Sequence, residues 1–468
     1  MLRHILLLLS GNAATSLMLF ARNLILARLV SVEDYGIAST FAIAMAVVEV
    51  STQFGLQVQI VQDKKGEDPD FQAALQGFQV LRGVISGVIL FFAAGAIADF
   101  MNIPDVAWAY QMMALIPVLR SLQHFDIHRL NRDMRFAPLV LTSAMPALAS
   151  LLALWPLAAF LNDYRVMLYA LLLQGVLETL TSHLLAERRY RLVLDRAVIA
   201  ESVRFGWPLL LNGVLLFLVF QGDKVIVGRE LGIEVLAVVA MGFTLTLTPT
   251  QIVSRSIRNL FLTHLSRYGE ARRETPTAFQ DTAEAAVQGN LLGGTAVVVG
   301  ALLLGPWFVD VFLGDDFQDL SWMLIWLAIQ QGIRVFKNGP NLVSLALGFT
   351  GNALASNLVR VASLGATWWA ATNGHGLPAI LAIAIVAELL GWALSLALMQ
   401  MKVAMAMAPL LPSHLSAVGV AVMAGIASGA SGLGLTEQWA AGALWLCLAF
   451  FGLLLFSSRA FLRHFRNK

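Results

Sequence analysis

Cysteine and charge are both scarce in this chain. It has one cysteine, Cys447, in 468 residues. A single cysteine excludes an intrachain disulfide, and its thiol is expected to be a small core residue. Only 13% of the residues are charged, against roughly 25% in a typical soluble domain. With 58% hydrophobic residues and a mean hydropathy of +0.74, no soluble fold could bury so much apolar surface. The composition therefore predicts an all-α, polytopic membrane protein.

Catalytic signatures are absent as well. The chain has no GxxxxGK[ST] loop, which excludes an ATP-driven motor, and no HExxH, CxxC or nucleophile elbow. His124 and His128 lie one helical turn apart but have no third ligand nearby in the sequence, so no metal site is predicted. Its arginine clusters are explained by membrane topology and contact with anionic membrane lipids, not by nucleic acid. We therefore expect no enzyme activity and no cofactor apart from a coupling ion.

Long apolar runs dominate what is present. A helix needs about 20 apolar residues to cross a bilayer, and the runs predict about fourteen transmembrane helices. The predicted helices are 5–29, 34–57, 73–97, 105–125, 137–160, 164–185, 205–228, 233–254, 283–305, 320–346, 352–373, 377–400, 412–430 and 438–458. The segments 186–204 and 255–282, the longest between helices, are predicted to be amphipathic cytoplasmic linkers.

The positive charges indicate the orientation. With the N-terminus inside, most of the 31 lysine and arginine residues, Arg120 among them, fall in inner loops and tails, whereas only Arg28, Arg165 and Arg229 fall in outer loops. This asymmetry follows the positive-inside rule. It predicts a multi-pass protein with both termini and the loop 126–136 in the cytoplasm.

The chain also repeats itself. The first apolar run ends in Arg28-Leu29-Val30-Ser31-Val32-Glu33, and the seventh ends in Arg229-Glu230-Leu231-Gly232-Ile233-Glu234, with similar residue types in most of the same places. Two similar halves are typical of secondary transporters. The repeat predicts two pseudo-twofold-related lobes of six helices, 1–195 and 196–402, followed by two extra helices and a cytoplasmic tail over 403–468.

Ionisable residues inside the predicted helices are the candidate site. Six are cations and four are carboxylates, namely Arg22, Arg82, Lys224, Arg334, Lys337 and Arg360 against Glu49, Glu178, Asp223 and Glu388. Such residues face the bundle interior and mark a transport path, or form structural ion pairs. Because four acids cannot neutralise six bases, the positive excess suggests an anionic substrate.

Three motifs carry a family resemblance. Arg129-Leu130-Asn131-Arg132-Asp133-Met134-Arg135-Phe136 resembles the R-x-x-R-x-[ML]-x-F signature of bacterial polysaccharide exporters. Ala27-Arg28-Leu29-Val30 followed by Glu33-Asp34-Tyr35-Gly36 resembles them too, as does Phe205-Gly206-Trp207-Pro208 leading to Asp223-Lys224. In this order the motifs resemble the Wzx-type oligosaccharide flippases of the multidrug/oligosaccharidyl-lipid/polysaccharide superfamily, especially the colanic-acid or succinoglycan exporter branch.

The resemblance implies a fold and a function. It implies two lobes around a V-shaped cavity that opens alternately to either side of the bacterial inner membrane. The substrate would be an undecaprenyl-pyrophosphate-linked oligosaccharide for exopolysaccharide or O-antigen synthesis, and a gradient of H+ or Na+ would drive its transport. We further expect a monomer that works beside polysaccharide polymerase machinery.

The cations are assigned to this substrate. Arg334 and Lys337 share one face of a helix, and with Arg360, and with Arg22 and Arg82 from the other lobe, they are predicted to receive the pyrophosphate. Pairing of Arg334 with Glu388 is the competing interpretation. The remaining charged residues, Asp223, Lys224, Glu49 and Glu178, together with Glu388, are assigned to ion coupling or structural pairs.

Three other functions stay open. A lipid II flippase would also have fourteen helices, although the Arg132 to Phe136 motif argues against it. A multidrug or cation exporter of the same superfamily should have an acidic or apolar cavity. A polymerase or membrane glycosyltransferase should have a large loop outside the membrane, and none is predicted here.

Overall fold

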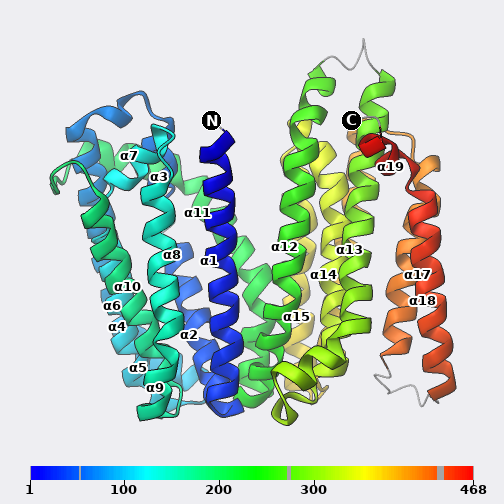
Figure 1. The fold of residues 1–468 in the computed structure, drawn as a ribbon, viewed down its shortest axis with the longest axis horizontal. Coiled ribbons are helices and arrows are strands. Elements are labelled where there is room, and N and C mark those ends of the chain that lie inside the picture. The colour runs from blue at the N-terminus through cyan, green and yellow to red at the C-terminus, as the bar shows by residue number, and fades with distance from the viewer. Residues whose placement is uncertain (1, 52–53, 271–275, 429–436, 467–468) are drawn as a thin grey trace. The chain divides into compact units, whose positions relative to one another are not determined.

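The chain forms a bundle of helices. A computed structural model describes residues 2–51, 54–270, 276–428 and 437–466, and this part of the chain contains helices and turns but no β-strand (Figure 1). The predicted all-α fold class is therefore confirmed. Nearly every backbone amide of a helix is bonded within its own segment, which is what a hydrocarbon environment requires.

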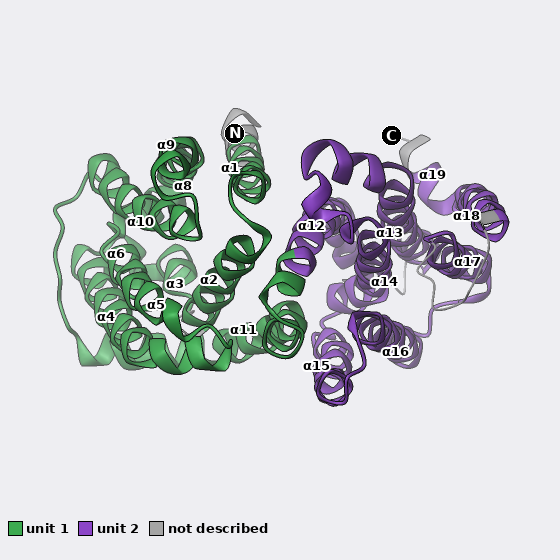
Figure 2. Cartoon of the chain, turned by 90° about the horizontal axis from the view of Figure 1, so that it is seen from below, with its two compact units in different colours: residues 1–237 green, residues 238–468 purple. Residues whose placement is uncertain are grey.

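The chain divides into two compact units, residues 1–237 and 238–468 (Figure 2). The helices up to the end of the first unit are α1 (Leu2–Leu29), α2 (Val32–Ser51), α3 (Leu56–Gln62), η1 (Lys64–Glu67), α4 (Pro69–Phe100), η2 (Pro104–Val106), α5 (Ala107–Met113), α6 (Leu115–Ser121), α7 (Asp126–Arg132), α8 (Ala137–Leu152), α9 (Leu154–Leu161), α10 (Arg165–Leu185) and α11 (Arg196–Glu230). The second unit contains nearly all of α12 (Ile233–Glu270), and then α13 (Pro276–Phe312), η3 (Asp315–Phe317), α14 (Leu320–Ala346), α15 (Gly351–Thr372), α16 (Leu377–Val403), η4 (Ala408–Leu410), α17 (Leu411–Ala427), α18 (Glu437–Ser457) and α19 (Arg459–Arg466). The lobe boundaries inferred from the sequence repeat stay a prediction.

In the described part of the chain, each predicted helix overlaps one α-helix or two consecutive ones, and residues 52–53 and 429–430 of the predictions 34–57 and 412–430 lie outside the described residues. The prediction 320–346 has the same ends as α14, whereas 105–125 is divided between α5 and α6. Among the described residues, nine segments are long and apolar enough to span a membrane. The chain is thus a multi-pass membrane protein, and the number of fourteen crossings stays a prediction. The charged helix α14 is not among the nine, because Arg334 and Lys337 lower its hydropathy.

The neighbouring helices extend into both predicted linkers, and whether these segments are amphipathic and cytoplasmic stays a prediction. Helix α12 continues through residues 255–270 and α13 begins at Pro276, so both helices extend well beyond their apolar runs. Likewise α11 begins at Arg196, capped by the side chain of Asp195, which accepts hydrogen bonds from the amides of Ala197 and Val198. The apolar run marks only the part of a helix that is expected in hydrocarbon, and polar helical turns continue past it.

Close backbone contact fixes the segment 186–195 on α4. The amide of Val193 donates to the carbonyl of Ala73 at 3.1 Å. A Cβ added at Gly77 would lie 2.1 Å from the carbonyl oxygen of Val193, and this backbone atom cannot rotate away. Only glycine therefore permits this contact.

We expect Gly77→Leu to destabilise the protein by about 1–3 kcal/mol, the usual cost of overpacking. Thermal unfolding of the purified protein in detergent measures it. Gly95→Leu is the matched control, because Gly95 lies on the same helix and an added Cβ there meets nothing within 4 Å. Equal melting temperatures of the two variants would contradict the prediction.

Candidate functional site

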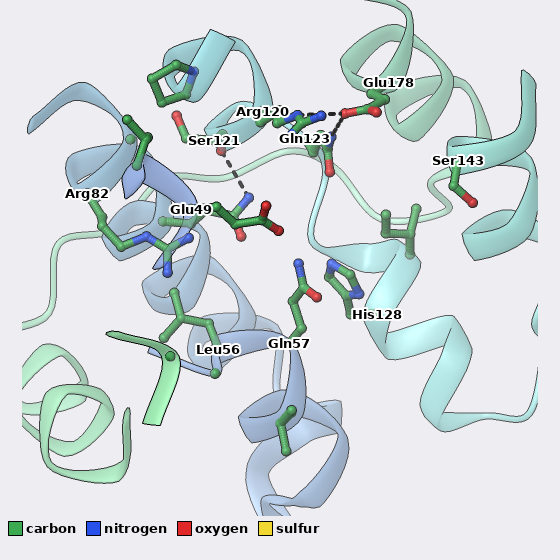
Figure 3. A pocket seen from close by; sticks show the side chains of 18 of the residues that line it. Glu49, Leu56, Gln57, Arg82, Arg120, Ser121, Gln123, His128, Ser143 and Glu178 are labelled. Atoms are coloured by element: carbon green, nitrogen blue, oxygen red, sulfur yellow. Dashed lines mark hydrogen bonds and ion pairs between the residues drawn. The ribbon is translucent and has the colours of Figure 1, made fainter. Parts of the chain in front are cut away.

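A polar cavity of about 780 Å³ lies within the first unit. Residues from α1, α2, α3, α4, α6, α7, α8, α10 and α11 contribute to its wall. Most of its polar side chains are uncharged, namely Asn12, Gln57, Gln79, Ser121, Gln123, His128, Thr142, Ser143 and Asn212, and its charged ones are Glu49, Arg82, Arg120 and Glu178 (Figure 3). The cavity thus joins amides and hydroxyls with two arginines and two carboxylates.

Glu178 on α10 is held by several donors at the cavity wall. Arg120 Nε lies 3.1 Å from its Oε2, and the amide nitrogen of Gln123 donates to the same oxygen at 3.1 Å (Figure 3). The other oxygen, Oε1, accepts from the amide of Gln174 at 2.7 Å. Glu178 therefore forms an ion pair with Arg120, and its predicted role, in ion coupling or as a structural pair, stays a prediction.

Arg120 corrects the sequence interpretation. It was counted among the inner-loop cations although it falls within the predicted helix 105–125; it lies in α6, and its side chain, 36% exposed, lines the cavity. Helix α6 approaches α4 closely, since a Cβ at Gly83 would lie 2.3 Å from Ser121 Oγ. This close approach brings Arg120 to the same cavity as Arg82, one residue before Gly83.

Arg82 and Glu49 face the cavity from α4 and α2 (Figure 3). Glu49 is exposed to the cavity, whereas Arg82 is half-buried. Of the five predicted pyrophosphate ligands, Arg82 is the one that lines this cavity. An arginine there offers a planar, bidentate grip on a phosphate group.

Arg22 is buried nearby but does not line the cavity. Its Nη1 donates to Ser150 Oγ at 3.0 Å and to Gln174 Oε1 at 2.6 Å. Because Gln174 also donates to Glu178, a continuous polar chain runs from Arg22 through Gln174 and Glu178 to Arg120. Its predicted contact with pyrophosphate stays untested.

His128 lies at the cavity wall on the short helix α7, in the loop between two predicted transmembrane helices. It is 7% exposed, and burial lowers its pKa from 6.5 to about 4. The imidazole is therefore neutral at pH 7, and it can donate and accept hydrogen bonds but adds no charge to the cavity.

We expect acidification to destabilise the protein partly through His128. Its folded-state pKa lies below the unfolded value, so the unfolded state binds more protons as the pH falls from 6.5 to about 4. At pH 5 the loss is about 2 kcal/mol relative to pH 7. His128→Gln should reduce this loss, measured by unfolding at pH 7 and pH 5. His124, whose pKa is also lowered by burial, is present in both proteins and so cancels. An unchanged pH dependence would contradict the assignment.

The arginines of the R-x-x-R motif lie on α7 and bond to residues within and around this helix, and we call this network the clamp. Arg129 Nε donates to Asp126 Oδ1 at 2.6 Å, and Arg129 Nη1 donates to Asp133 Oδ2 at 3.1 Å. Arg132 donates to the carbonyls of Ile60, Val61 and Asp63 at the end of α3, where a cation satisfies free carbonyls and favours the helix dipole. This part of the motif is therefore structural.

Asp126 is the buried centre of this clamp. Besides Arg129, its carboxylate accepts from the amides of Glu187 at 2.8 Å and Arg188 at 3.2 Å. Burial alone would raise the pKa of Asp126, but the hydrogen bonds from these three residues outweigh it and hold the pKa below the ordinary value. The clamp thus joins α7 to the segment that follows α10.

A second cluster of charges is buried within the second unit. Glu388 on α16 accepts from Arg334 Nη2 at 2.7 Å and from Lys337 Nζ at 2.8 Å, and Arg360 Nε lies 3.7 Å away. Glu388 and Arg360 are 0% exposed and Lys337 is 2% exposed. The structure thus shows the competing interpretation, an ion pair of Arg334 with Glu388, and it adds two further cations to that pair. A binding role for the three cations is not tested by this pairing.

The ten predicted residues do not gather at one place. Arg82, Glu49 and Glu178 line the cavity of the first unit, whereas Arg334, Lys337, Arg360 and Glu388 form the buried cluster of the second. Asp223 and Lys224 lie on α11, the former buried and the latter half-buried, and neither lines this cavity. Their predicted role in ion coupling or a structural pair stays a prediction.

The amides of the cavity were not predicted from the sequence. Asn12, Gln57, Gln79, Gln123 and Asn212 line it, and each falls within a predicted transmembrane helix. Uncharged amides cost less to bury than ions but still require hydrogen-bond partners. Their presence within apolar runs was the available signal, and a search limited to ionisable residues could not find it.

The chain matches one known protein family in sequence and several solved structures in fold. The profile of a family described as "Polysaccharide biosynthesis protein" matches residues 25–322. No curated protein matches the chain in sequence. Among solved structures, the chain is similar to the lipid II flippase MurJ in an inward closed conformation, with a TM-score of 0.70 and 13% identity over 98% of this chain and 99% of that one.

Two further solved structures share the fold. One is an inward-facing multidrug resistance MATE family transporter of the MOP superfamily, with a TM-score of 0.67 and 14% identity over 82% of this chain and 94% of that one. The other is a MOP superfamily transporter from Pyrococcus furiosus described by the reverse polarity of its binding pocket, with a TM-score of 0.51 and 14% identity over 85% of this chain and 95% of that one. These likenesses show that the chain shares the fold of these solved structures.

Proposed function

Because the chain belongs to the polysaccharide biosynthesis protein family, we propose that it flips an undecaprenyl-pyrophosphate-linked oligosaccharide across the bacterial inner membrane. The movement is from the inner to the outer leaflet and supplies exopolysaccharide or O-antigen synthesis. Within the family, the motifs at 129–136 and 205–208 favour the colanic-acid or succinoglycan exporter branch. The structures that share its fold are transporters and flippases rather than enzymes.

The lining of the cavity in the first unit is the observation that carries this proposal. Its amides and hydroxyls can donate to and accept from sugar hydroxyls. Arg82 supplies a charge for the phosphates, which cannot cross about 30 Å of hydrocarbon unaided. A neutral His128 adds a hydrogen-bonding group without further charge.

The driving force is part of the proposal. We expect a gradient of H+ or Na+ to drive alternating access. Glu49, which is exposed to the cavity, and Glu178, which accepts hydrogen bonds from Arg120, Gln123 and Gln174, are the two candidate carboxylates for coupling in this cavity. The protein would act as a monomer among membrane lipids, beside polysaccharide polymerase machinery.

The proposed substrate is tested by identifying the lipid that accumulates when the protein is absent. A strain that lacks this gene should accumulate a lipid-linked oligosaccharide in the inner leaflet, and the wild-type gene should clear it. A lipid II flippase is the second candidate, favoured by likeness to such a flippase over 98% of the chain, and its loss would accumulate lipid II instead. A strain that accumulates neither lipid but becomes sensitive to drugs would identify a multidrug exporter.

We expect Asp133→Cys to react with a membrane-impermeant maleimide only after the inner membrane is opened, because the loop 126–136 is predicted to be cytoplasmic. Background labelling is low, since the only native cysteine, Cys447, is buried. Asp316→Cys, in a predicted outer loop, should react in cells whose inner membrane is intact. Labelling of Asp133→Cys in such cells would show that the loop lies outside and would contradict the predicted orientation.

A further inference from the structure

An apolar groove of about 550 Å³ lies next to the polar cavity within the first unit. Helices α2, α4, α5 and α11 form it, and its wall includes Ala44, Val47, Ile89, Leu90, Ala93 and Ile97. The three hydroxyls in the wall are all hydrogen-bonded within the protein: Ser86 Oγ donates to the carbonyl of Arg82 at 2.9 Å, Thr40 Oγ1 donates to that of Ile37 at 2.7 Å, and the Tyr110 hydroxyl bonds to Thr40 Oγ1. The groove therefore offers a ligand an almost entirely apolar surface.

One face of α4 serves both the cavity and the groove. Gln79 and Arg82 line the polar cavity, and Ser86, Leu90, Ala93 and Ile97 line the groove. Successive residues in this series are three or four positions apart, so they follow one side of the helix. The surface changes from polar to apolar within one turn, between Arg82 and Ser86.

The other two long helices show the same division. On α2, Val48 lines both the cavity and the groove, and Glu49 beside it lines the cavity. On α11, Leu216 lines the cavity and the next residue, Phe217, lines the groove. The polar and apolar compartments therefore adjoin on three helices, as a ligand with a polar head and a long apolar chain requires.

We propose that the groove binds the isoprenoid chain of the substrate while the polar cavity holds its pyrophosphate and sugars. This inference rests on the proposed function. Along α4 the groove extends from Ser86 to Phe100, about 21 Å at the helical rise per residue, which is long enough for several isoprene units. Leu90 and Ala44 at the floor are buried, whereas Ile89 at the rim is 62% exposed, so the chain can enter sideways from the bilayer.

Chain length provides the test. Undecaprenyl pyrophosphate and dimethylallyl pyrophosphate have the same head, but only the former has a chain that can fill the groove. Binding of both probes is measured on the full-length protein in nanodiscs, for wild type and for Ala93→Trp, which fills the groove. We expect Ala93→Trp to weaken binding of undecaprenyl pyrophosphate about tenfold or more and to leave binding of dimethylallyl pyrophosphate unchanged.

Two further variants make the test specific. Gly95→Trp is the matched control, since Gly95 lies on the opposite side of α4 and an added Cβ meets nothing within 4 Å; it should bind both probes as wild type does. Ala96→Trp blocks the same groove from an exposed position and repeats the test if Ala93→Trp fails to fold.

Several results would overturn the inference. One is that folded Ala93→Trp and Ala96→Trp bind undecaprenyl pyrophosphate as tightly as wild type does, and another is that they lose binding of both probes equally. A phospholipid that crosslinks from the groove and is not displaced by undecaprenyl pyrophosphate would identify a bilayer lipid as the occupant. If wild-type protein binds neither pyrophosphate, both the proposed function and the assignment of the groove to the isoprenoid chain are contradicted. If it binds both probes with equal affinity, only the assignment of the groove is contradicted.

Discussion

Glu388→Gln should destabilise the protein by about 3–5 kcal/mol, the usual cost of leaving a buried charge without its partner. Glu388 is the shared counter-ion of Arg334, Lys337 and Arg360, and its carboxylate is completely buried. The glutamine keeps the size and the hydrogen-bonding oxygen but removes the charge. Three cations would then repel one another in a medium of low dielectric constant. Unfolding of the purified protein in detergent measures the loss.

Two variants control this measurement. Glu178→Gln removes a carboxylate whose partner, Arg120, is 36% exposed, and solvent screening should limit its effect to about 1 kcal/mol. Adding Lys337→Met to Glu388→Gln removes one of the three repelling cations and should restore part of the stability. If Glu388→Gln were as stable as Glu178→Gln, the cluster would not hold α14, α15 and α16 together.

The same cluster decides between the two roles of Arg334. Transport lost in Arg334→Glu and restored by adding Glu388→Arg would make Arg334 a structural partner. Partial transport in Arg334→Lys, with none in stably folded Arg334→Gln and Lys337→Gln, would support contact with the pyrophosphate.

Arg82→Gln should lower transport of the lipid-linked oligosaccharide by about 10- to 100-fold, because a charged hydrogen bond to phosphate is worth about 1.5–3 kcal/mol. Arg82 lines the polar cavity of the first unit, and the glutamine can still donate to a sugar or phosphate oxygen without the charge. Transport is measured as clearance of the accumulated lipid in the deletion strain, normalised to folded protein. Arg82→Lys should retain part of the activity, since it keeps the charge but not the bidentate geometry.

Arg165→Gln is the matched control for this change. Arg165 pairs with Asp163 at 2.7 Å outside the cavity, so its loss should leave transport within about twofold of wild type. Wild-type transport by well-folded Arg82→Gln would show that the phosphates bind elsewhere, and the buried cations of the second unit would then be the next candidates.

Local sequence was sufficient to locate the helices. Both ends of α14 were predicted to the residue. An apolar run with a helix-compatible composition begins after Asp319, and it stops before the turn at Gly348, whose φ is positive. Where an apolar run continues into polar helical turns, as at the end of α12, the run alone could not predict the boundary. Hydrocarbon selects for apolar residues and places no limit on a helix outside it.

The partners of the charged residues depended on the tertiary structure. Arg334 is 54 residues from Glu388, and Arg22 is 152 residues from Gln174. Such pairs form only after helices pack, and charge type and helical spacing do not say which faces meet. For the same reason the arginines of the R-x-x-R motif were read as a family signature, while the structure shows Arg132 bonded to the end of α3.

The sequence by itself determined that this is an all-α membrane protein of many helices whose apolar core contains more positive than negative charge. Only the tertiary structure decided where that charge lies. It places Arg334, Lys337 and Arg360 around one buried carboxylate, and it places Arg82 in a separate cavity lined by amides, hydroxyls, a second arginine and two carboxylates. The physical reason is that burial and neighbours determine what a charge can bind, and both come from helix packing rather than from sequence order.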